Sequence, residues 1–397
     1  MSKIDFDFMI SGAGLVGSLL ALQLSKLNFK ICLIESSDFE ISLNEENLFN
    51  PLSLNYRSKI ILEKYNIWSQ ISQYAHPINK LSIKHINNIN VVSFGAEEIN
   101  LDAMGYVVDR YRLLKIIRES VKSHGRISIL ENSKINNIER KNDHVCVQVD
   151  SDDGNRLLAK KIFISEGASS KFKQLVSEKS ENIDYAQKSY FINCDCDFNE
   201  NHAVQIFNKH GIFALIPYSA KSLNIVMSIK SDFSNLYFEN NKPKTDNILD
   251  IFNQYVTNVK SLRFVNMHNL NTSRNDEFYK DKIFLLGNTF QVLHPVGAQG
   301  YNFSLRNISS IVKYFANDAQ SSQNMDSLIE EIMRDREQVI TTVDFATKIF
   351  SSDKLFSKTL SKLFVKSLKM SSKLRNSFLE KLLGIYEYPY LDTDEKL

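Results

Sequence analysis

The sequence predicts an α/β protein: a Rossmann-like nucleotide-binding domain, interrupted by a β-rich domain and completed by a helical C-terminal region. Three observations support this fold class. A glycine-rich turn lies between two apolar runs near the start of the chain. Short strand-like runs separated by turns fill residues 185–268, and helical periodicity dominates after His294, to about residue 383. We find no internal repeat and no low-complexity linker, so the β-rich part reads as an insertion.

The first thirty-odd residues have the layout of a dinucleotide-binding unit. The apolar run Phe6–Ser11 predicts a buried strand, and residues 18–27 carry apolar side chains at helical spacing. A second buried strand, 31–34, ends at Glu35. Between the first strand and the helix stands a Gly-x-Gly-x-x-Gly turn, which is weak evidence alone but strong evidence between two strands.

Each residue type has a physical role in such a turn. Gly12 lets the chain leave the strand sharply, Gly14 lets a pyrophosphate approach the backbone, and Gly17 lets the helix pack close to the strand. An acid about 20 residues further on accepts hydrogen bonds from a ribose. The alternative is a glycine-rich turn that binds nothing, which we disfavour. The predicted cofactor-binding residues here are Gly12, Ala13, Gly14, Val16, Gly17 and Glu35.

The composition fits a large globular enzyme and excludes other classes. Hydrophobic residues make up 43% and charged residues 24%, which excludes wholesale disorder, and the net charge of +2 does not indicate a nucleic-acid partner. Cys194 and Cys196 are a conceivable redox or metal pair, but we favour alternating strand residues and predict no metal site. Without a signal-like N-terminus or a run long enough to span a bilayer, we expect a cytoplasmic protein.

The remaining elements follow from periodicity. A polar, turn-rich loop is predicted over 40–51, and helices are predicted over 58–71, 111–123 and most of 294–383. Strands are predicted over 81–84, 91–94, 127–130, 145–149, 161–164, 211–217, 223–229 and 283–286. We therefore divide the chain into a discontinuous nucleotide-binding domain (1–75, 103–184 and 275–335), a β-sheet substrate domain (76–102 and 185–274) and a C-terminal helical region (336–397).

Four separated motifs give the chain a family resemblance. They are Gly12–Gly17, Gly105–Asp109, Ser165–Ser170 and Gly287–Arg306. In this order the motifs resemble those of the single-component FAD-dependent aromatic hydroxylases, and most closely the ubiquinone-biosynthesis hydroxylases. The resemblance covers most of the chain. It implies FAD as cofactor, a sheet domain that roofs the flavin ring, and NAD(P)H as a transient reductant without a fingerprint of its own.

The last motif is predicted to form a loop beside the flavin. Gly297 and Gly300 leave room where backbone approaches a planar ring, and Pro295 stiffens the loop. The helix after Gly300 would direct its positive end toward the reduced ring. No residue is identified with certainty as catalytic. The predicted flavin-proximal residues are His294, Pro295, Gly297, Gln299 and Gly300, and the resemblance adds Gly287, Asn288, Gly300 and Asn302 as cofactor-binding residues. For His294 we favour loop shaping over proton transfer.

The chain also departs from the family pattern. Where the family has Gly-Asp, this chain has Gly287-Asn288, and an amide keeps an acceptor oxygen but loses the charge. Further departures are Gln291 for His, Glu166 for Asp, Lys173 for Arg, Ser304 for Gly and Leu48 for an upstream Arg. They suggest a drifted substrate class, weaker FAD retention or a degenerate member.

A basic amphipathic pattern marks the C-terminal region. Lysines recur near every fourth residue at 354, 358, 362, 366, 369 and 373, beside an apolar face formed by residues 356, 360, 363, 364 and 368. Such a helix can lie on an anionic membrane or dock on an acidic lipid-carrying partner. A helix packed on its own domain is an equal alternative. Together with a lipid-soluble substrate, the first reading suggests a peripheral position at the inner membrane surface.

These observations predict an FAD-dependent monooxygenase. Its expected reaction is hydroxylation of an aromatic ring, with a polyprenylated phenol on the route to ubiquinone as the expected substrate. One alternative is another flavin oxidoreductase of the same fold, such as a reductase or a halogenase. The lone tryptophan, Trp68, does not match the Trp-rich motif of halogenases. The other alternative is a degenerate scaffold subunit of a biosynthetic complex.

Overall fold

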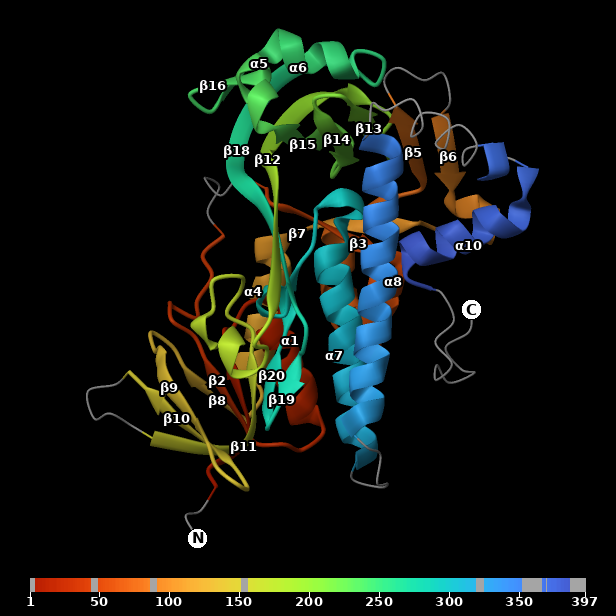
Figure 1. The fold of residues 1–397 in the computed structure, drawn as a ribbon. Coiled ribbons are helices and arrows are strands. Elements are labelled where there is room, and N and C mark those ends of the chain that lie inside the picture. The colour runs from red at the N-terminus through yellow and green to blue at the C-terminus, as the bar shows by residue number, and fades with distance from the viewer. Residues whose placement is uncertain are drawn as a thin grey trace.

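The computed structural model describes residues 4–43, 49–85, 91–150, 156–318, 325–351, 366–368 and 370–385. The chain forms two large sheets, one above the other in Figure 1, with long helices along one side. The predicted fold class, α/β with a helical C-terminal region, is confirmed.

The lower sheet, here called the nucleotide sheet, has eight strands with the main order β19-β20-β11-β1-β2-β8, and β10 and β9 extend from β11. Its strands β1, β2, β8, β11 and β20 are parallel. Runs of apolar residues form β1 and β2 because helices cover both faces of such a sheet. The bounds are β1 Phe6–Ser11, β2 Ile31–Ile34, β8 Ile127–Leu130, β9 Ile135–Arg140, β10 Val145–Val149, β11 Arg156–Ile164, β19 Tyr279–Lys280 and β20 Ile283–Leu285.

Helices α1 (Leu15–Lys26), α4 (Arg110–Lys122) and α7 (Gln299–Asp318) pack with this sheet, and α8 (Met325–Ser351) runs alongside α7 (Figure 1). The helix predicted over 58–71 is divided into α2 (Tyr56–Lys64) and α3 (Trp68–Ile71). Asn66 interrupts it with a φ of 58°, a left-handed conformation that asparagine adopts more readily than most residues. The single predicted helix is therefore wrong at this point.

The upper sheet, here called the substrate sheet, also has eight strands, in the order β21-β18-β12-β15-β14-β13-β5-β6. Two of them are far longer than predicted: β12 has 19 residues and β18 has 20, and both extend down toward the nucleotide sheet in Figure 1. The bounds are β5 Lys80–His85, β6 Val91–Gly95, β12 Ser180–Phe198, β13 His202–Asn208, β14 Gly211–Pro217, β15 Ser222–Lys230, β18 Val256–Asn275 and β21 Gln291–Val292.

Two helices that periodicity did not predict, α5 (Ser234–Tyr237) and α6 (Thr245–Phe252), cover one face of the substrate sheet. Buried side chains alternate along the strands: Val204 and Ile206 of β13, for example, belong to the core beneath these helices. The intervening residues of β13 point to the opposite face. The short strands β16 (Phe238–Glu239) and β17 (Lys242–Pro243) form a separate ribbon.

A small sheet lies between the two large ones. It consists of β3 (Pro51–Asn55), β7 (Gly105–Asp109) and β4 (His76–Ile78), in the order β3-β7-β4. Short 3₁₀ turns complete the fold at Ser72–Tyr74, Ala96–Ile99, Lys171–Leu175, Ser231–Phe233, Gly287–Thr289 and Val296–Ala298.

The division into domains stays a prediction, and the sheets relate to it as follows. Strands β5 and β6 join the substrate sheet despite their early position in the chain. Strand β12 crosses the predicted boundary at residues 184/185, and β18 crosses that at 274/275. Because both strands are continuous across these boundaries, the two predicted domains are joined by strands rather than by a linker.

The C-terminal region contains α10 (Ser372–Leu383) after α8. Of the predicted basic helix, Lys354, Lys358, Lys362 and Lys369 lie outside the described residues. Lys366 and Lys373 are described and exposed. Within the described residues, no helix is long and apolar enough to cross a membrane.

Candidate functional site

The glycine-rich turn has the geometry that its sequence predicts. Gly12 has a φ of +91°, and a Cβ there would lie 2.6 Å from the carbonyl oxygen of Ser165. A Cβ on Gly17 would lie 2.0 Å from the carbonyl oxygen of Gly12. Only glycine therefore allows β1 to turn into α1 and lets α1 pack this close to the turn.

Gly14 differs from its neighbours because its missing Cβ borders open space. Apart from its chain neighbours and the backbone of its own helix, no heavy atom lies within 4 Å of the position that a Cβ would take. Gly14 is also the N-cap of α1, and no side chain caps this helix end. The first-turn N–H groups and the positive end of the helix dipole thus face a space next to bare backbone, which is the arrangement that binds phosphate.

Glu35 is held at the end of β2 by a buried arginine. Its Oε2 accepts from the backbone N–H of Ala13 at 2.8 Å and from Nη2 of Arg118 at 3.3 Å. Arg118 also donates through Nε to the carbonyl oxygen of Ala13 at 2.9 Å, and its guanidinium lies over the ring of Phe39. Glu35 is therefore positioned beside the turn, where a ribose would follow a bound pyrophosphate.

Sequence reasoning missed Arg118, although a signal was present. Arg118 stands four residues after Leu114 and three before Val121, in the helix predicted over 111–123, and this spacing places it on the same face as those apolar residues. A cation at such a position needs buried acceptors. Arg118 finds them at Ala13, at Phe39 and at Glu35.

The third and fourth motifs close onto the first. Ser165 donates through Oγ to the carbonyl oxygen of Gly12 at 2.9 Å, and Oγ1 of Thr289 accepts from the backbone N–H of Gly167 at 2.9 Å. A Cβ on Gly287 would lie 3.2 Å from Cγ2 of Val16. Residues separated by more than 250 positions in the sequence thus form one continuous site.

Several positions that depart from the family pattern have structural explanations. Glu166 accepts hydrogen bonds from the hydroxyls of Ser11 and Ser170. Lys173 donates to the carbonyl oxygen of Ala168, and Ser304 donates to that of Gly300 at 3.0 Å. These side chains serve local structure. Leu48 lies outside the described residues.

The two remaining departures lie in opposite environments. Asn288 is exposed and makes no side-chain hydrogen bond within the described part of the chain. Gln291 is 4% exposed, and neither polar atom of its amide has a partner among the described residues. Asn288 is thus free to contact a ligand, whereas Gln291 is an uncompensated polar group in the interior.

His294 is buried at the start of the flavin-proximal loop. Its Nδ1 accepts from the backbone N–H of Val296 at 3.3 Å, and its ring packs edge-on against Tyr185. Burial lowers the pKa of His294 to about 4, against a weaker opposing effect of Asp344. With this pKa the imidazole is neutral at physiological pH, and it contacts the loop through the backbone of Val296. Its role in shaping the loop stays a prediction.

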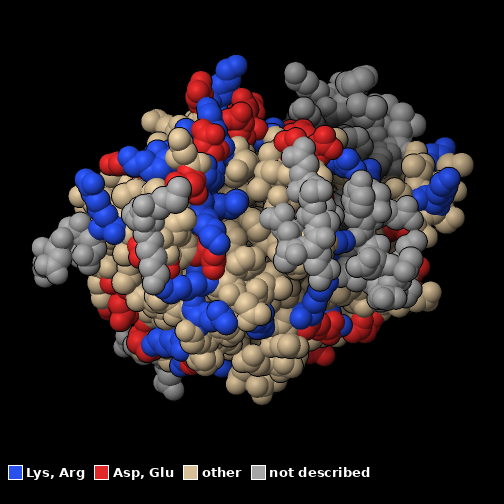
Figure 2. Space-filling model, turned by 90° about the horizontal axis from the view of Figure 1, so that it is seen from below, with Lys and Arg blue, Asp and Glu red and all other residues tan. Residues whose placement is uncertain are grey.

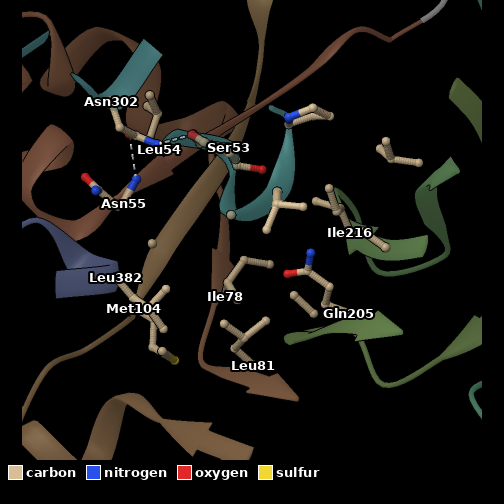
Figure 3. A pocket seen from close by; sticks show the side chains of 18 of the residues that line it. Ser53, Leu54, Asn55, Ile78, Leu81, Met104, Gln205, Ile216, Asn302 and Leu382 are labelled. Carbon is tan, nitrogen blue, oxygen red and sulfur yellow. Dashed lines mark hydrogen bonds between the residues drawn. The ribbon is translucent and has the colours of Figure 1, made fainter. Parts of the chain in front are cut away.

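Asn302 fastens the first turn of α7 to the small sheet. Its Oδ1 accepts from the backbone N–H of Asn55 at 3.0 Å and from Oγ of Ser58 at 2.6 Å. Its Nδ2 donates to the carbonyl oxygens of Ser53 at 3.1 Å and Ala298 at 2.7 Å (Figure 3). The amide is fully used inside the protein, so we assign it a positioning role.

A pocket of about 370 Å³ opens beside this loop. Its walls come from β3, from the loop and first turn of α7, from the substrate sheet and from α10 (Figure 3). The pocket is lined by Pro295, Gly297 and Gly300 of this loop, but not by His294. Apart from its chain neighbours and the backbone of its own helix, no heavy atom lies within 4 Å of the position of a Cβ on Gly300, so bare backbone faces the pocket there.

Most of the pocket wall is apolar. The apolar lining residues include Ile78, Leu81, Met104, Phe191, Ile216, Val226, Phe378 and Leu382. The sequence does not predict the wall contributed by α10, because its residues lie about 80 positions from the loop. Nε2 of Gln299 contacts the carbonyl oxygen of Leu382 at 3.4 Å, which ties α10 to the loop.

The geometry of the glycine-rich turn, of Glu35 and of the loop at Gly300 fits FAD. The uncapped helix end at Gly14 lies beside the acid Glu35, and bare backbone at Gly300 borders the apolar pocket. A carboxylate suits a ribose, and glycines beside an apolar pocket suit a planar ring. The fold and this site define a flavoprotein.

The chain belongs to the FAD binding domain family, whose sequence profile matches residues 5–345. FAD is its cofactor, and the predicted class, a flavin-dependent monooxygenase, is confirmed. NAD(P)H is the reductant typical of this family.

Ubiquinone hydroxylases are among its relatives. The ubiquinone hydroxylase UbiM of Neisseria meningitidis is 20% identical over 83% of this chain and 73% of that protein. The 3-demethoxyubiquinol 3-hydroxylase of Escherichia coli is 22% identical over 80% of this chain and 81% of that protein. In fold, the chain is similar to p-nitrophenol 4-monooxygenase PnpA of Pseudomonas putida, with a TM-score of 0.76, 15% identity, and coverage of 98% of this chain and 100% of the other.

Proposed function

We propose that this protein hydroxylates the aromatic ring of a polyprenylated phenol on the route to ubiquinone, with FAD as cofactor and NAD(P)H and O₂ as co-substrates. The observation that carries the proposal is the pocket itself. Its glycine-containing edge, at Gly297 and Gly300, belongs to the flavin-proximal loop, and its opposite wall is the apolar face of the substrate sheet. A ring held between the two would lie next to the flavin.

The residues that would hold FAD follow from the geometry above. The turn around Gly14 would bind the pyrophosphate through backbone N–H groups, and Glu35 would accept from the ribose. Asn288, exposed and unbonded among the described residues, would contact the chain between pyrophosphate and ring. When bound and reduced, FAD supplies the oxygen-activating chemistry.

The protein contributes orientation and exclusion of water. Side chains such as Ile78, Ile216 and Leu382 would surround the substrate and keep the reacting ring dry. The same apolar walls suit an attached hydrocarbon tail, because each buried CH₂ contributes about 0.8 kcal/mol. The names of the two ubiquinone hydroxylases among the relatives support the choice of ring and tail.

One experiment distinguishes this function from two alternatives, another flavin oxidoreductase of this fold and a degenerate scaffold subunit. The scaffold alternative is supported by Gln291, whose buried amide has no partner among the described residues, and by the uncharged Asn288, because both depart from the family's cofactor-binding pattern.

The test uses the purified full-length protein loaded with FAD. Incubation with NADH or NADPH, O₂ and short-tailed prenyl phenols should yield a product heavier by one oxygen atom, detected by mass spectrometry. A yellow protein that oxidises NAD(P)H and releases only hydrogen peroxide with every phenol would contradict hydroxylation. A colourless protein that does not take up FAD would favour the scaffold.

We also propose a peripheral contact with an anionic membrane surface or an acidic lipid-carrying partner. Met370 and Leu374 are 76% and 54% exposed, and Lys366 and Lys373 are exposed nearby in the chain. Apolar and basic side chains together are the combination that holds a helix at an anionic surface. Since α10 forms part of the pocket wall, such a contact would bring a lipid-soluble substrate close to its site.

On the one face seen in Figure 2, acidic and basic side chains are both present around a largely uncharged area.

A further inference from the structure

Strand β13 presents one polar side chain to the pocket. Val204 and Ile206 point into the core beneath α5 and α6, so Ala203, Gln205 and Phe207 face the other way and line the pocket. In Figure 3 the amide of Gln205 extends between Ile78 and Ile216. It thus lies on the wall opposite the flavin-proximal loop.

The amide of Gln205 has no hydrogen-bond partner within the described residues, and it is neither fully buried nor fully exposed. Other polar groups of the pocket either bond within the protein or are buried: Oη of Tyr301, Oδ1 of Asn224 and Nδ2 of Asn55 are buried without a hydrogen-bond partner among the described residues, whereas Gln205 is half-buried. Thr342 donates through Oγ1 to the carbonyl oxygen of Gln338 at 2.8 Å. Asn224 has no exposed surface, and its Nδ2 donates to the backbone carbonyl oxygen of Ile192 and to Asn193.

Small neighbours give Gln205 room for a ligand. Ala214 is its direct partner on β14, and Ala203 is the previous pocket-facing residue on β13. Two alanines flanking an unpaired amide leave a polar notch in a largely apolar wall. A purely apolar ligand would fill the notch and leave the amide unpaired, which is unfavourable once water is excluded.

Resting on the function proposed above, we propose that Gln205 binds a ring oxygen of the substrate and so selects hydroxylated aromatic rings over unsubstituted ones. A carboxamide can accept from a phenol O–H through Oε1 and donate to a phenol or ether oxygen through Nε2. It therefore suits rings that carry neighbouring hydroxyl and alkoxy groups. The hydrogen bond also fixes how the ring is turned toward the loop at Gly297 and Gly300, and with it the carbon that reacts.

The test compares two ligands that differ by one hydroxyl group. Equilibrium dialysis of the FAD-loaded protein, without reductant, gives dissociation constants for para-butylphenol and butylbenzene. Their ratio in the parent protein is the reference. In Gln205→Leu the ratio should shift by about tenfold against the phenol, the effect expected when a buried polar contact is lost. Gln205→Met, closer in shape, should shift it likewise.

Thr342→Val is the matched control. It removes a polar atom from the same pocket, but one already bonded within its own helix, so the ratio should stay at the parental value. FAD content and thermal unfolding of each variant confirm that it is folded. An unchanged ratio in both Gln205 variants would overturn this inference and leave hydroxylation intact. A parent protein that binds neither ligand would overturn the proposed function as well.

Discussion

Replacing Gly14 with valine is expected to abolish tight FAD binding while leaving the protein folded. The backbone of Gly14 has φ −69° and ψ −173°, which any residue adopts, and the new Cβ would have no heavy atom within 4 Å apart from its chain neighbours and its own helix backbone. The free energy of unfolding of the FAD-free protein should therefore change by less than about 1 kcal/mol. The branched side chain would instead occupy the space that we assign to the pyrophosphate.

The expected loss follows from the contacts displaced. A hydrogen bond to a charged group contributes about 1.5–3 kcal/mol, so losing one or two N–H contacts to the pyrophosphate weakens binding by roughly tenfold to a thousandfold or more. Fluorescence titration of the FAD-free protein with FAD measures this change. Chemical denaturation of the same sample without FAD measures stability.

Gly17→Ala provides the contrast. Its single added carbon would meet the carbonyl oxygen of Gly12 at 2.0 Å and Oγ of Ser165 at 2.5 Å, so α1 has to move. Overpacking of this kind costs about 1–3 kcal/mol or more, and it should appear without FAD. The reasoning is refuted if Gly14→Val binds FAD as tightly as the parent, or if it unfolds as readily as Gly17→Ala.

The remaining predictions concern single sites. Asn288→Asp should tighten FAD binding by about 1 kcal/mol in the same titration, because a charge-assisted hydrogen bond replaces a neutral one; weaker binding would contradict this. His294 has a pKa lowered from 6.5 to about 4, so the protein should lose up to about 3 kcal/mol as pH falls through this interval, and a denaturation series should show a smaller loss in His294→Gln. Gln291→Met should raise the unfolding midpoint, by about 1 kcal/mol in stability, since it removes an unpaired buried amide; a lower midpoint would show that the amide is satisfied. Changing Lys366 and Lys373 to Glu should reduce sedimentation with anionic vesicles, most visibly at low salt, and equal binding of parent and variant would count against a membrane role.

Local patterns were sufficient for the elements around the nucleotide site. Strands β1 and β2 have the predicted bounds, because a buried parallel strand needs only a run of apolar residues. The single helix predicted over 58–71 failed at Asn66, where backbone conformation rather than periodicity decides. Helices α5 and α6 were missed because they are short and lie in a stretch dominated by strand-like alternation.

The lengths of β12 and β18 could not be read from the sequence. Their residues 180–184 and 271–275 are largely polar, yet they pair with one another across the gap between the two large sheets. Pairing of this kind depends on the partner strand, and backbone hydrogen bonds hold the polar segments. The same limit applies to the pocket, because α10 is brought to it by contacts such as that of Leu382 with Gln299.

The motif residues divide into two physical groups once the site is folded. Gly14 and Gly300 leave empty space where a ligand can approach, and Asn288 keeps its amide exposed. Asn302, by contrast, forms four hydrogen bonds through its amide, all with other groups of the protein. A sequence motif contains both groups, because FAD binding is lost either when a side chain fills the ligand space or when a hydrogen bond that positions the loop is removed. The groups separate by experiment: substitutions in the first should change affinity for FAD alone, whereas Asn302→Leu should also destabilise the FAD-free protein.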